Sequence, residues 1–174
     1  MEHRRQLLVR TTGLVATALA ALALTAGPVS ASQTLPFNAA ISGTLQVTEM
    51  GPNGPTSAFY SGDGVATQLG ATYMEGTISI QGPAACPNGF TATHSDTLTA
   101  SNGDQVFMAI TETSCPRPTD PGTYDCTGTY AVTGGTGRFS SETGSGEWAG
   151  SVAFSPTGSA TFSTTYSGVL SGPR

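Results

Sequence analysis

Three polar side chains in the sequence are candidates for catalysis because their types can transfer protons or stabilise charge. They are Tyr166, His94 and Arg138. Histidine titrates near neutral pH, and a tyrosine hydroxyl that faces an enclosed pocket can exchange a proton with a bound molecule. Arg138 lies in a glycine-rich segment, where it can cover the entrance to a pocket or pair with Glu142. A single histidine is more often a surface or hydrogen-bonded residue than a catalyst, so His94 has two alternative roles.

Four large apolar side chains are candidates for binding a ligand: Trp148, Phe139, Met74 and Phe162. Alternate residues of a β-strand face the same side, so Phe162 shares a face with Tyr166, and Met74 shares a face with Ile78. These faces are expected to point into the protein. A purely structural place in the core is the alternative for Trp148.

Sequence motifs for several other chemistries are missing. The sequence contains no G-x-S-x-G nucleophile motif and no phosphate-binding loop. Cys86, Cys115, Cys126 and His94 do not have the spacing of zinc ligands. Neither a metal nor another cofactor is therefore expected.

The elements that must position these side chains are β-strands, because apolar and polar residues alternate with a period of two. Short links between the stretches make neighbouring strands antiparallel. The expected fold is all-β, an eight-stranded antiparallel up-and-down barrel, which leaves no open sheet edge. A two-sheet β-sandwich is the alternative. The expected strands are about 41–48, 57–69 with an interruption at 62–64, 71–80, 90–100, 105–113, 123–133, 144–154 and 159–170.

The N-terminal segment has the composition of a secretory signal. Arg4 and Arg5 precede an apolar run over about 13–26, and small residues lead to a predicted cleavage after Ala31. The predicted organisation is a signal peptide over 1–31, a flexible leader over 32–40 and a single barrel domain over 41–174. The protein is expected to be secreted through the general pathway or the twin-arginine pathway.

The charge of the exported part restricts its partners. After Ala31 the sequence has ten acidic residues, no lysine, and three arginines at 117, 138 and 174. Nucleic acid and anionic membrane surfaces are poor partners for such a chain, because both require basic residues. We expect a small apolar molecule as the partner, no stable membrane anchor, and a monomer or small homo-oligomer.

The three cysteines predict one disulfide and one free thiol in an oxidising compartment. Cys115 and Cys126 flank a proline-rich loop, and a bond between them is the expected pairing. The rival pairing is Cys86 with Cys115, because both lie in loops that can share one end of the domain.

The glycine-rich segment between the sixth and seventh strands carries a family resemblance. It reads Val132-Thr133-Gly134-Gly135-Thr136-Gly137-Arg138-Phe139 and is followed by Gly144. This segment resembles the V-x-G-G-T-G-x-F…G motif of dirigent proteins and allene oxide cyclase-like barrels. Gly62-Asp63-Gly64…Leu69-Gly70 and Ser101-Asn102-Gly103-Asp104 resemble segments of the bacterial members, and the likeness covers about 41–170.

The resemblance implies an eight-stranded antiparallel barrel around an apolar cavity. Several members of this superfamily direct cyclisation or coupling reactions without a cofactor. None of their catalytic residues can be transferred to a position of this sequence. From the residues themselves, we expect the glycines to let the chain fold inward across a barrel mouth with Phe139 as a plug, or to form only a tight corner.

Three functions are compatible with these observations. The first is a cofactor-independent isomerase or cyclase that acts on a small apolar molecule inside the barrel. The second is a non-catalytic, lipocalin-like carrier of such a molecule. The third is a structural cell-envelope protein whose barrel is filled by its own side chains. The size of the interior space and the presence of buried polar groups distinguish these functions.

Overall fold

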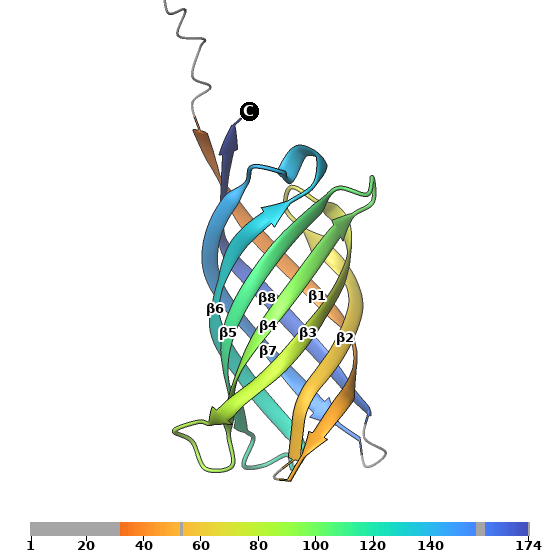
Figure 1. Ribbon diagram of the computed structural model, residues 1–174, viewed down its shortest axis with the longest axis vertical. Helices are drawn as coiled ribbons and strands as arrows, with labels where there is room; N and C mark the ends of the chain where they lie inside the picture. Colours follow the sequence, from red (N-terminus) through yellow and green to blue (C-terminus); the bar gives the residue numbers. More distant parts are fainter. Residues whose placement is uncertain (1–31, 53, 156–158, 174) are drawn as a thin grey trace, which may run out of the picture.

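The computed structural model describes residues 32–52, 54–155 and 159–173, and these residues form a β-barrel (Figure 1). One short 3₁₀ helix, η1, interrupts the sequence of strands. Each strand is antiparallel to the next, as the alternating sequence predicted. The elements are β1 (Ser32–Gly51), β2 (Gly54–Ala66), β3 (Gly70–Pro83), β4 (Phe90–Ala100), β5 (Gln105–Pro116), β6 (Thr123–Gly135), η1 (Gly137–Phe139), β7 (Thr143–Phe154) and β8 (Ser159–Pro173).

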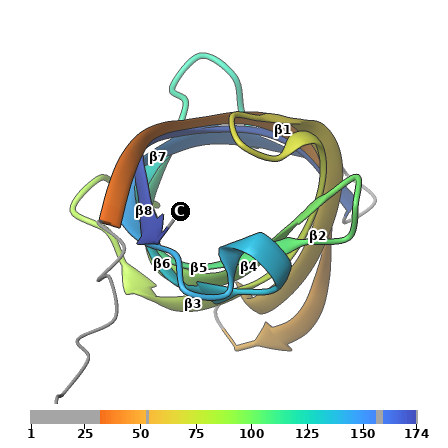
Figure 2. The ribbon, with the colours of Figure 1, turned by 90° about the horizontal axis from the view of Figure 1, so that it is seen from above.

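The barrel closes through pairing of the first strand with the last. β1 and β8 pair from Ser32↔Pro173 to Gln46↔Ser159, and Figure 2 shows the resulting ring of strands. The predicted eight-stranded up-and-down barrel is therefore confirmed, and the alternative β-sandwich is wrong. Closure gives each strand two neighbours, so no sheet edge is left unpaired.

Two expectations about the strands need correction. Residues 32–40, expected to be a flexible leader, are the first part of β1 and pair with β8. Phe37 and Ala39 are buried there, so the alternation of apolar residues begins earlier than predicted. β2 is continuous through Gly62 and Gly64, because both glycines lie close to the backbone of β1. The predicted signal peptide lies outside the described residues.

Within the described ranges, no helix has both the length and the apolar character that a membrane-crossing helix needs.

One end of the barrel is closed by apolar side chains, at the end where η1 and the C-terminus lie in Figure 1. The closing residues come from five elements and are almost completely buried: Phe37, Leu98, Val106, Phe139 and Leu170. η1 turns Phe139 into this core, as expected for a plug. The turn requires glycine at position 137, where φ is +55° and a Cβ atom would lie 1.8 Å from Asp104 Oδ1.

Candidate functional site

The other half of the barrel contains a cavity of about 980 Å³. Its lining includes Gly51, Pro83, Asn88 and Gly122, which belong to the connections β1–β2, β3–β4 and β5–β6 or to the strand ends beside them. The cavity therefore reaches the end of the barrel opposite η1. Its volume is at the upper end of the range of about 300–1,000 Å³ that is typical of small-molecule sites.

The wall near the mouth is mainly apolar. Tyr124 stands between Phe90 and Phe154, with ring centroids 5.6 Å and 5.9 Å apart. Ile78 and Val152 continue the apolar surface toward the middle of the barrel. A molecule that enters from this end therefore meets aromatic and aliphatic side chains first.

Deeper in the cavity, the carboxylate of Asp96 on β4 is the central polar group. Asp96 is only 3% exposed, and it accepts hydrogen bonds from the hydroxyl groups of Tyr60 on β2 and Tyr166 on β8, the latter at 2.5 Å. Burial is the largest influence and raises the pKa of Asp96, although the charge of His94 and the two tyrosine hydrogen bonds act in the opposite direction. Asp96 is thus a carboxyl group whose charged form is costly.

The two tyrosines are neutral donors at physiological pH. Burial, followed by the negative charge of Asp96, raises the pKa of both Tyr60 and Tyr166 well above the ordinary value. Tyr166 also lies 3.2 Å from the sulfur of Met74 and packs edge-on against Tyr130. These contacts fix the direction of its hydroxyl group toward Asp96.

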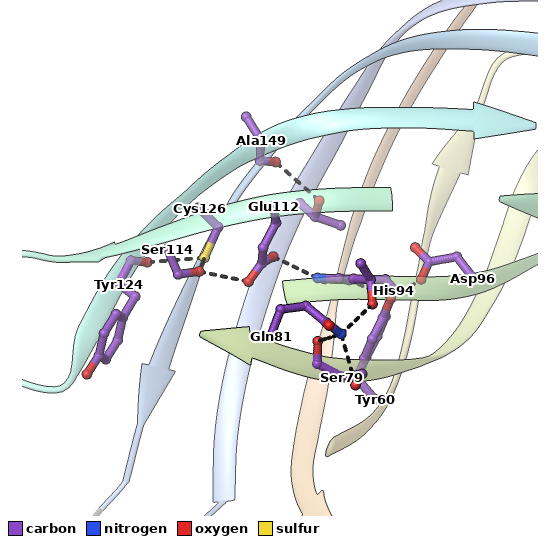
Figure 3. A network of polar contacts seen from close by, with 12 residues as sticks. Tyr60, Ser79, Gln81, His94, Asp96, Glu112, Ser114, Tyr124, Cys126 and Ala149 are labelled. Atoms are coloured by element: carbon purple, nitrogen blue, oxygen red, sulfur yellow. Dashed lines mark hydrogen bonds and ion pairs between the residues drawn. The ribbon is translucent and has the colours of Figure 1, made fainter. Parts of the chain in front are cut away.

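A second row of polar groups extends from Tyr60 toward β6 (Figure 3). The Tyr60 hydroxyl lies 3.0 Å from His94 Nδ1, and His94 Nε2 lies 2.8 Å from Glu112 Oε2. The Nε2 contact does not have hydrogen-bond geometry, so it is a close polar contact rather than an aligned hydrogen bond. Ser114 donates to Glu112 Oε1 at 2.8 Å, and its oxygen lies 3.0 Å from Cys126 Sγ.

Cys126 ends this row as a thiol. Burial and, second, the charge of Glu112 raise the pKa of Cys126 to about 12. Because the thiolate is the nucleophilic form of cysteine, Cys126 is unsuited to nucleophilic chemistry at neutral pH.

The contact between Tyr60 and Asp96 depends on a glycine. Tyr60 pairs with Gly76, and Gly76 pairs with Asp96, so the three residues lie side by side on β2, β3 and β4. A Cβ atom at position 76 would lie 2.5 Å from the Tyr60 hydroxyl oxygen and 2.6 Å from Asp96 Oδ1. The missing side chain of Gly76 therefore leaves the space in which the hydroxyl and the carboxylate meet.

Gly76→Ala is expected to separate Tyr60 from Asp96 and to lower the free energy of unfolding by about 1–3 kcal/mol, as overpacking does. Urea unfolding measures the loss. The matched control is Gly82→Ala on the same strand, where a Cβ atom would meet nothing within 4 Å. Equal stability of the two variants would contradict this role of Gly76.

The structure brings most of the predicted site residues together. Tyr166, His94, Trp148, Met74 and Phe162 all line the cavity. The ring of Trp148 packs edge-on against His94, with centroids 5.2 Å apart. The pattern of alternation therefore assigned Tyr166, Trp148, Met74 and Phe162 to the correct face, whereas it left the face of His94 open.

Two predicted site residues lie elsewhere. Arg138 and Phe139 belong to η1 at the closed end and are not among the residues that line the cavity. Arg138 donates a 2.6 Å hydrogen bond to the carbonyl of Gln68, and its guanidinium lies 4.8 Å from the centre of the Phe139 ring. Asp104, not Glu142, is its acidic neighbour, at 3.7 Å. Arg138 therefore stabilises the position of η1 at the closed end of the barrel.

Sequence reasoning missed three residues of the site: Tyr60, Asp96 and Glu112. Each occupies an inward position of its strand with an apolar residue at an adjacent inward position, such as Leu98 beside Asp96 and Ile110 beside Glu112. A carboxylate at an apolar position of an alternating strand is unusual, because burial of an unpaired charge is costly. That signal was present and could have identified Asp96 and Glu112.

The predicted disulfide between Cys115 and Cys126 is wrong. The bond joins Cys86 and Cys115, whose Cα atoms are 5.9 Å apart, and Cys126 is free and buried. In the ladder between β5 and β6, Cys126 opposes Ser114 and not Cys115. Cys126 faces the interior, whereas Cys115 is on the other face of the sheet, so their sulfur atoms cannot meet.

Comparison with known proteins finds no family model that matches the chain, and no curated protein or solved structure that is significantly similar to it. The fold and the site therefore define the class. The protein is a closed eight-stranded antiparallel barrel with an internal cavity, and buried carboxylate, imidazole and phenol groups form part of the cavity wall.

Proposed function

We propose that the protein binds one uncharged, mainly apolar small molecule inside the barrel and rearranges it by acid–base catalysis without a cofactor. The observation that carries the proposal is Asp96, a buried carboxyl group in the wall of the cavity with a hydroxyl donor at each oxygen. The likeness of Val132–Phe139 to the glycine motif of dirigent and allene oxide cyclase-like barrels supports it, because several of those proteins direct rearrangements inside a barrel.

The charges of the site support an uncharged ligand. Among the described residues that line the cavity there is no lysine or arginine. Arg117 pairs with Asp125 on the surface, and Arg138 lies at the closed end. An anion in the cavity would face the buried carboxyl groups of Asp96 and Glu112 without a compensating cation, which is unfavourable at low dielectric.

The arrangement also supports proton transfer. A carboxyl group with a raised pKa is a stronger base once it is ionised, and it exchanges protons closer to neutral pH than an exposed aspartate does. Tyr60 and Tyr166 can donate hydrogen bonds to Asp96 in its charged form. The remaining apolar wall holds the ligand in one shape, which lowers the entropic part of the barrier.

A carrier without catalytic activity is the second candidate. It is favoured by the fact that Asp96 and Glu112 already have partners inside the protein. Buried polar groups that have hydrogen-bond partners inside the protein are compatible with a purely structural role. Both candidates require an accessible cavity, and a cavity of about 980 Å³ argues against a barrel filled by its own side chains.

Binding is tested with two dyes that differ only in charge. N-phenyl-1-naphthylamine is uncharged, and 8-anilinonaphthalene-1-sulfonate is the same ring system with a sulfonate. We expect the uncharged dye to bind with a Kd on the order of micromolar, and the sulfonate to bind about tenfold more weakly or worse. Trp148 is the only tryptophan and lines the cavity, so energy transfer from Trp148 to the dye reports binding.

Two variants test whether the dye binds inside the cavity. Ala58→Phe adds a ring to the cavity wall and is expected to weaken binding by about tenfold. Ala149→Phe adds the same ring to the exposed face of β7 and should leave the Kd unchanged. If both dyes bind equally, or if Ala58→Phe has no effect, the proposed uncharged ligand inside the barrel is wrong.

A further inference from the structure

We propose that Tyr60 is a proton relay that shares one proton between Asp96 and His94. The assignment rests on the position of one hydroxyl group, which bonds to Asp96 Oδ1 and also lies 3.0 Å from His94 Nδ1. Asp96 and His94 are two residues apart on β4 and therefore face the same side, and Tyr60 reaches both from β2 across Gly76. The catalytic use of the relay rests on the proposed function, whereas the shared proton does not.

The hydroxyl proton of Tyr60 can serve only one of its two neighbours at a time. When Tyr60 donates to Asp96, His94 Nδ1 must carry a proton and donate to the Tyr60 oxygen. When Tyr60 donates to Nδ1, Asp96 must carry the proton and donate to Tyr60. The two arrangements contain the same number of protons, and they interconvert by the movement of two protons along hydrogen bonds that already exist.

The other titratable groups around the relay keep it in place. Glu112 on β5 approaches the far side of the imidazole, at Nε2, and Tyr166 on β8 occupies the second oxygen of Asp96. Cys126 and Tyr130 on β6 carry neutral thiol and phenol groups, because burial raises the pKa of each to about 12. The described inward residues of β1, β3 and β7 add no titratable group.

This geometry makes Asp96 a base while the shared proton is on His94 Nδ1. Asp96 takes a proton from the ligand, a C–H or O–H bond of the ligand breaks, and its electron pair stays on the ligand. Nδ1 already carries a proton at this stage, so the proton from the ligand stays on Asp96. Asp96 then gives a proton to the ligand atom that faces it and becomes a base again. The sum is an isomerisation with no net change in protons or electrons.

The test is nuclear magnetic resonance of the full chain without ligand, across a pH series. His94 is one of only two histidines, and the signal of the other, His3, is identified with His3→Gln. We expect the ring ¹⁵N signals of His94 and the side-chain ¹³C signal of Asp96 to change together at one common pH midpoint, at which the pair loses its shared proton, because that step belongs to the pair and not to either residue alone. Tyr60→Phe should split this step into two midpoints about one pH unit or more apart.

Tyr166→Phe is the matched control, because it also removes a hydroxyl donor from Asp96 but leaves the bridge to His94 intact. It should keep the common midpoint. If Tyr60→Phe does not fold, 3-fluorotyrosine incorporated into the otherwise unaltered chain provides the same test, since the ¹⁹F signal of Tyr60 should follow that midpoint.

Separate midpoints in the unaltered chain, or a common midpoint that survives Tyr60→Phe, would overturn the relay. Failure of the relay is distinguishable from failure of the proposed function. If the uncharged dye binds in the cavity while the midpoints are separate, the relay alone is wrong. If the midpoint is common but neither dye enters the barrel, the proposed function is wrong and the shared proton remains.

Discussion

Asp96→Asn is expected to slow the exchange of deuterium from solvent into an uncharged ketone bound in the barrel by about 10²–10⁴-fold. 2-Tetralone is a suitable probe, because it is apolar and has a weakly acidic C–H bond beside its carbonyl group. The amide of asparagine preserves the size of the side chain and can still bond to Tyr60 and Tyr166, but it cannot accept the proton. Proton resonance of the ketone in D₂O measures the exchange rate.

The control for this experiment is Asp63→Asn, which removes an exposed carboxylate from the outer face of β2. It should leave the exchange rate unchanged. Binding of the uncharged dye in the absence of any exchange above the rate in buffer would identify the protein as a carrier. Equal rates for the two variants would show that Asp96 is not the base.

The same variant should also change how stability depends on pH. The pKa of Asp96 is raised in the folded protein, so its contribution to stability is complete at low pH and is lost as the pH rises through the raised value. The loss begins near pH 4, the ordinary value for an unfolded aspartate, about 3.9. Between pH 4 and the raised pKa of Asp96, the free energy of unfolding of the unaltered chain should fall by up to about 1.4 kcal/mol per pH unit relative to that of Asp96→Asn. Urea unfolding measures this difference.

Removal of the disulfide is the second change with a large expected effect. Cys86 and Cys115 are separated by 29 residues, and opening a loop of this length should lower the free energy of unfolding by about 3–4 kcal/mol. The melting temperature of the variant with both Cys86→Ser and Cys115→Ser should fall by about 10–15 °C. Thermal unfolding followed by circular dichroism measures the shift.

Cys126→Ser is the matched control, because it removes the free cysteine and retains the bond. It should cost about 1 kcal/mol or less, since serine can keep the contact with Ser114. Peptide mapping of the non-reduced chain should recover Cys86 and Cys115 in one linked pair. A linked pair that contains Cys126, or a larger loss from Cys126→Ser than from the double variant, would contradict the assignment.

The fold was predictable because the alternation of buried and exposed residues is nearly unbroken. In β4, Ala92, His94, Asp96, Leu98 and Ala100 are all buried at every second position. Short links then leave few topologies for eight antiparallel strands. The same alternation placed Met74, Trp148 and Tyr166 on the inner face, where they line the cavity.

The composition of the site was less predictable, because it depends on register. The contact between Tyr60 and Asp96 exists only because Gly76 lies between them in the ladder, and no local pattern shows which residues of β2, β3 and β4 are opposite one another. The predicted pairing of Cys115 with Cys126 was wrong for the same reason. The distance between Cys115 and Cys126 along the chain does not reveal that their side chains leave opposite faces of the sheet.

The position of Arg138 illustrates a different limit. The glycine-rich segment was expected at a barrel mouth, and it does lie at an end of the barrel. Successive connections of an up-and-down barrel alternate between its two ends, so the β6–β7 connection shares an end with the β2–β3 and β4–β5 turns. The cavity opens at the other end, and which end is hollow depends on the sizes of side chains packed together in three dimensions.

The seam between β1 and β8 has a consequence for the order of events during biogenesis. It joins Ser32 to Pro173, the largest separation among the described residues, so the barrel can close only after its last strand has left the ribosome. Such non-local pairing makes folding slow and leaves strand edges exposed in the meantime.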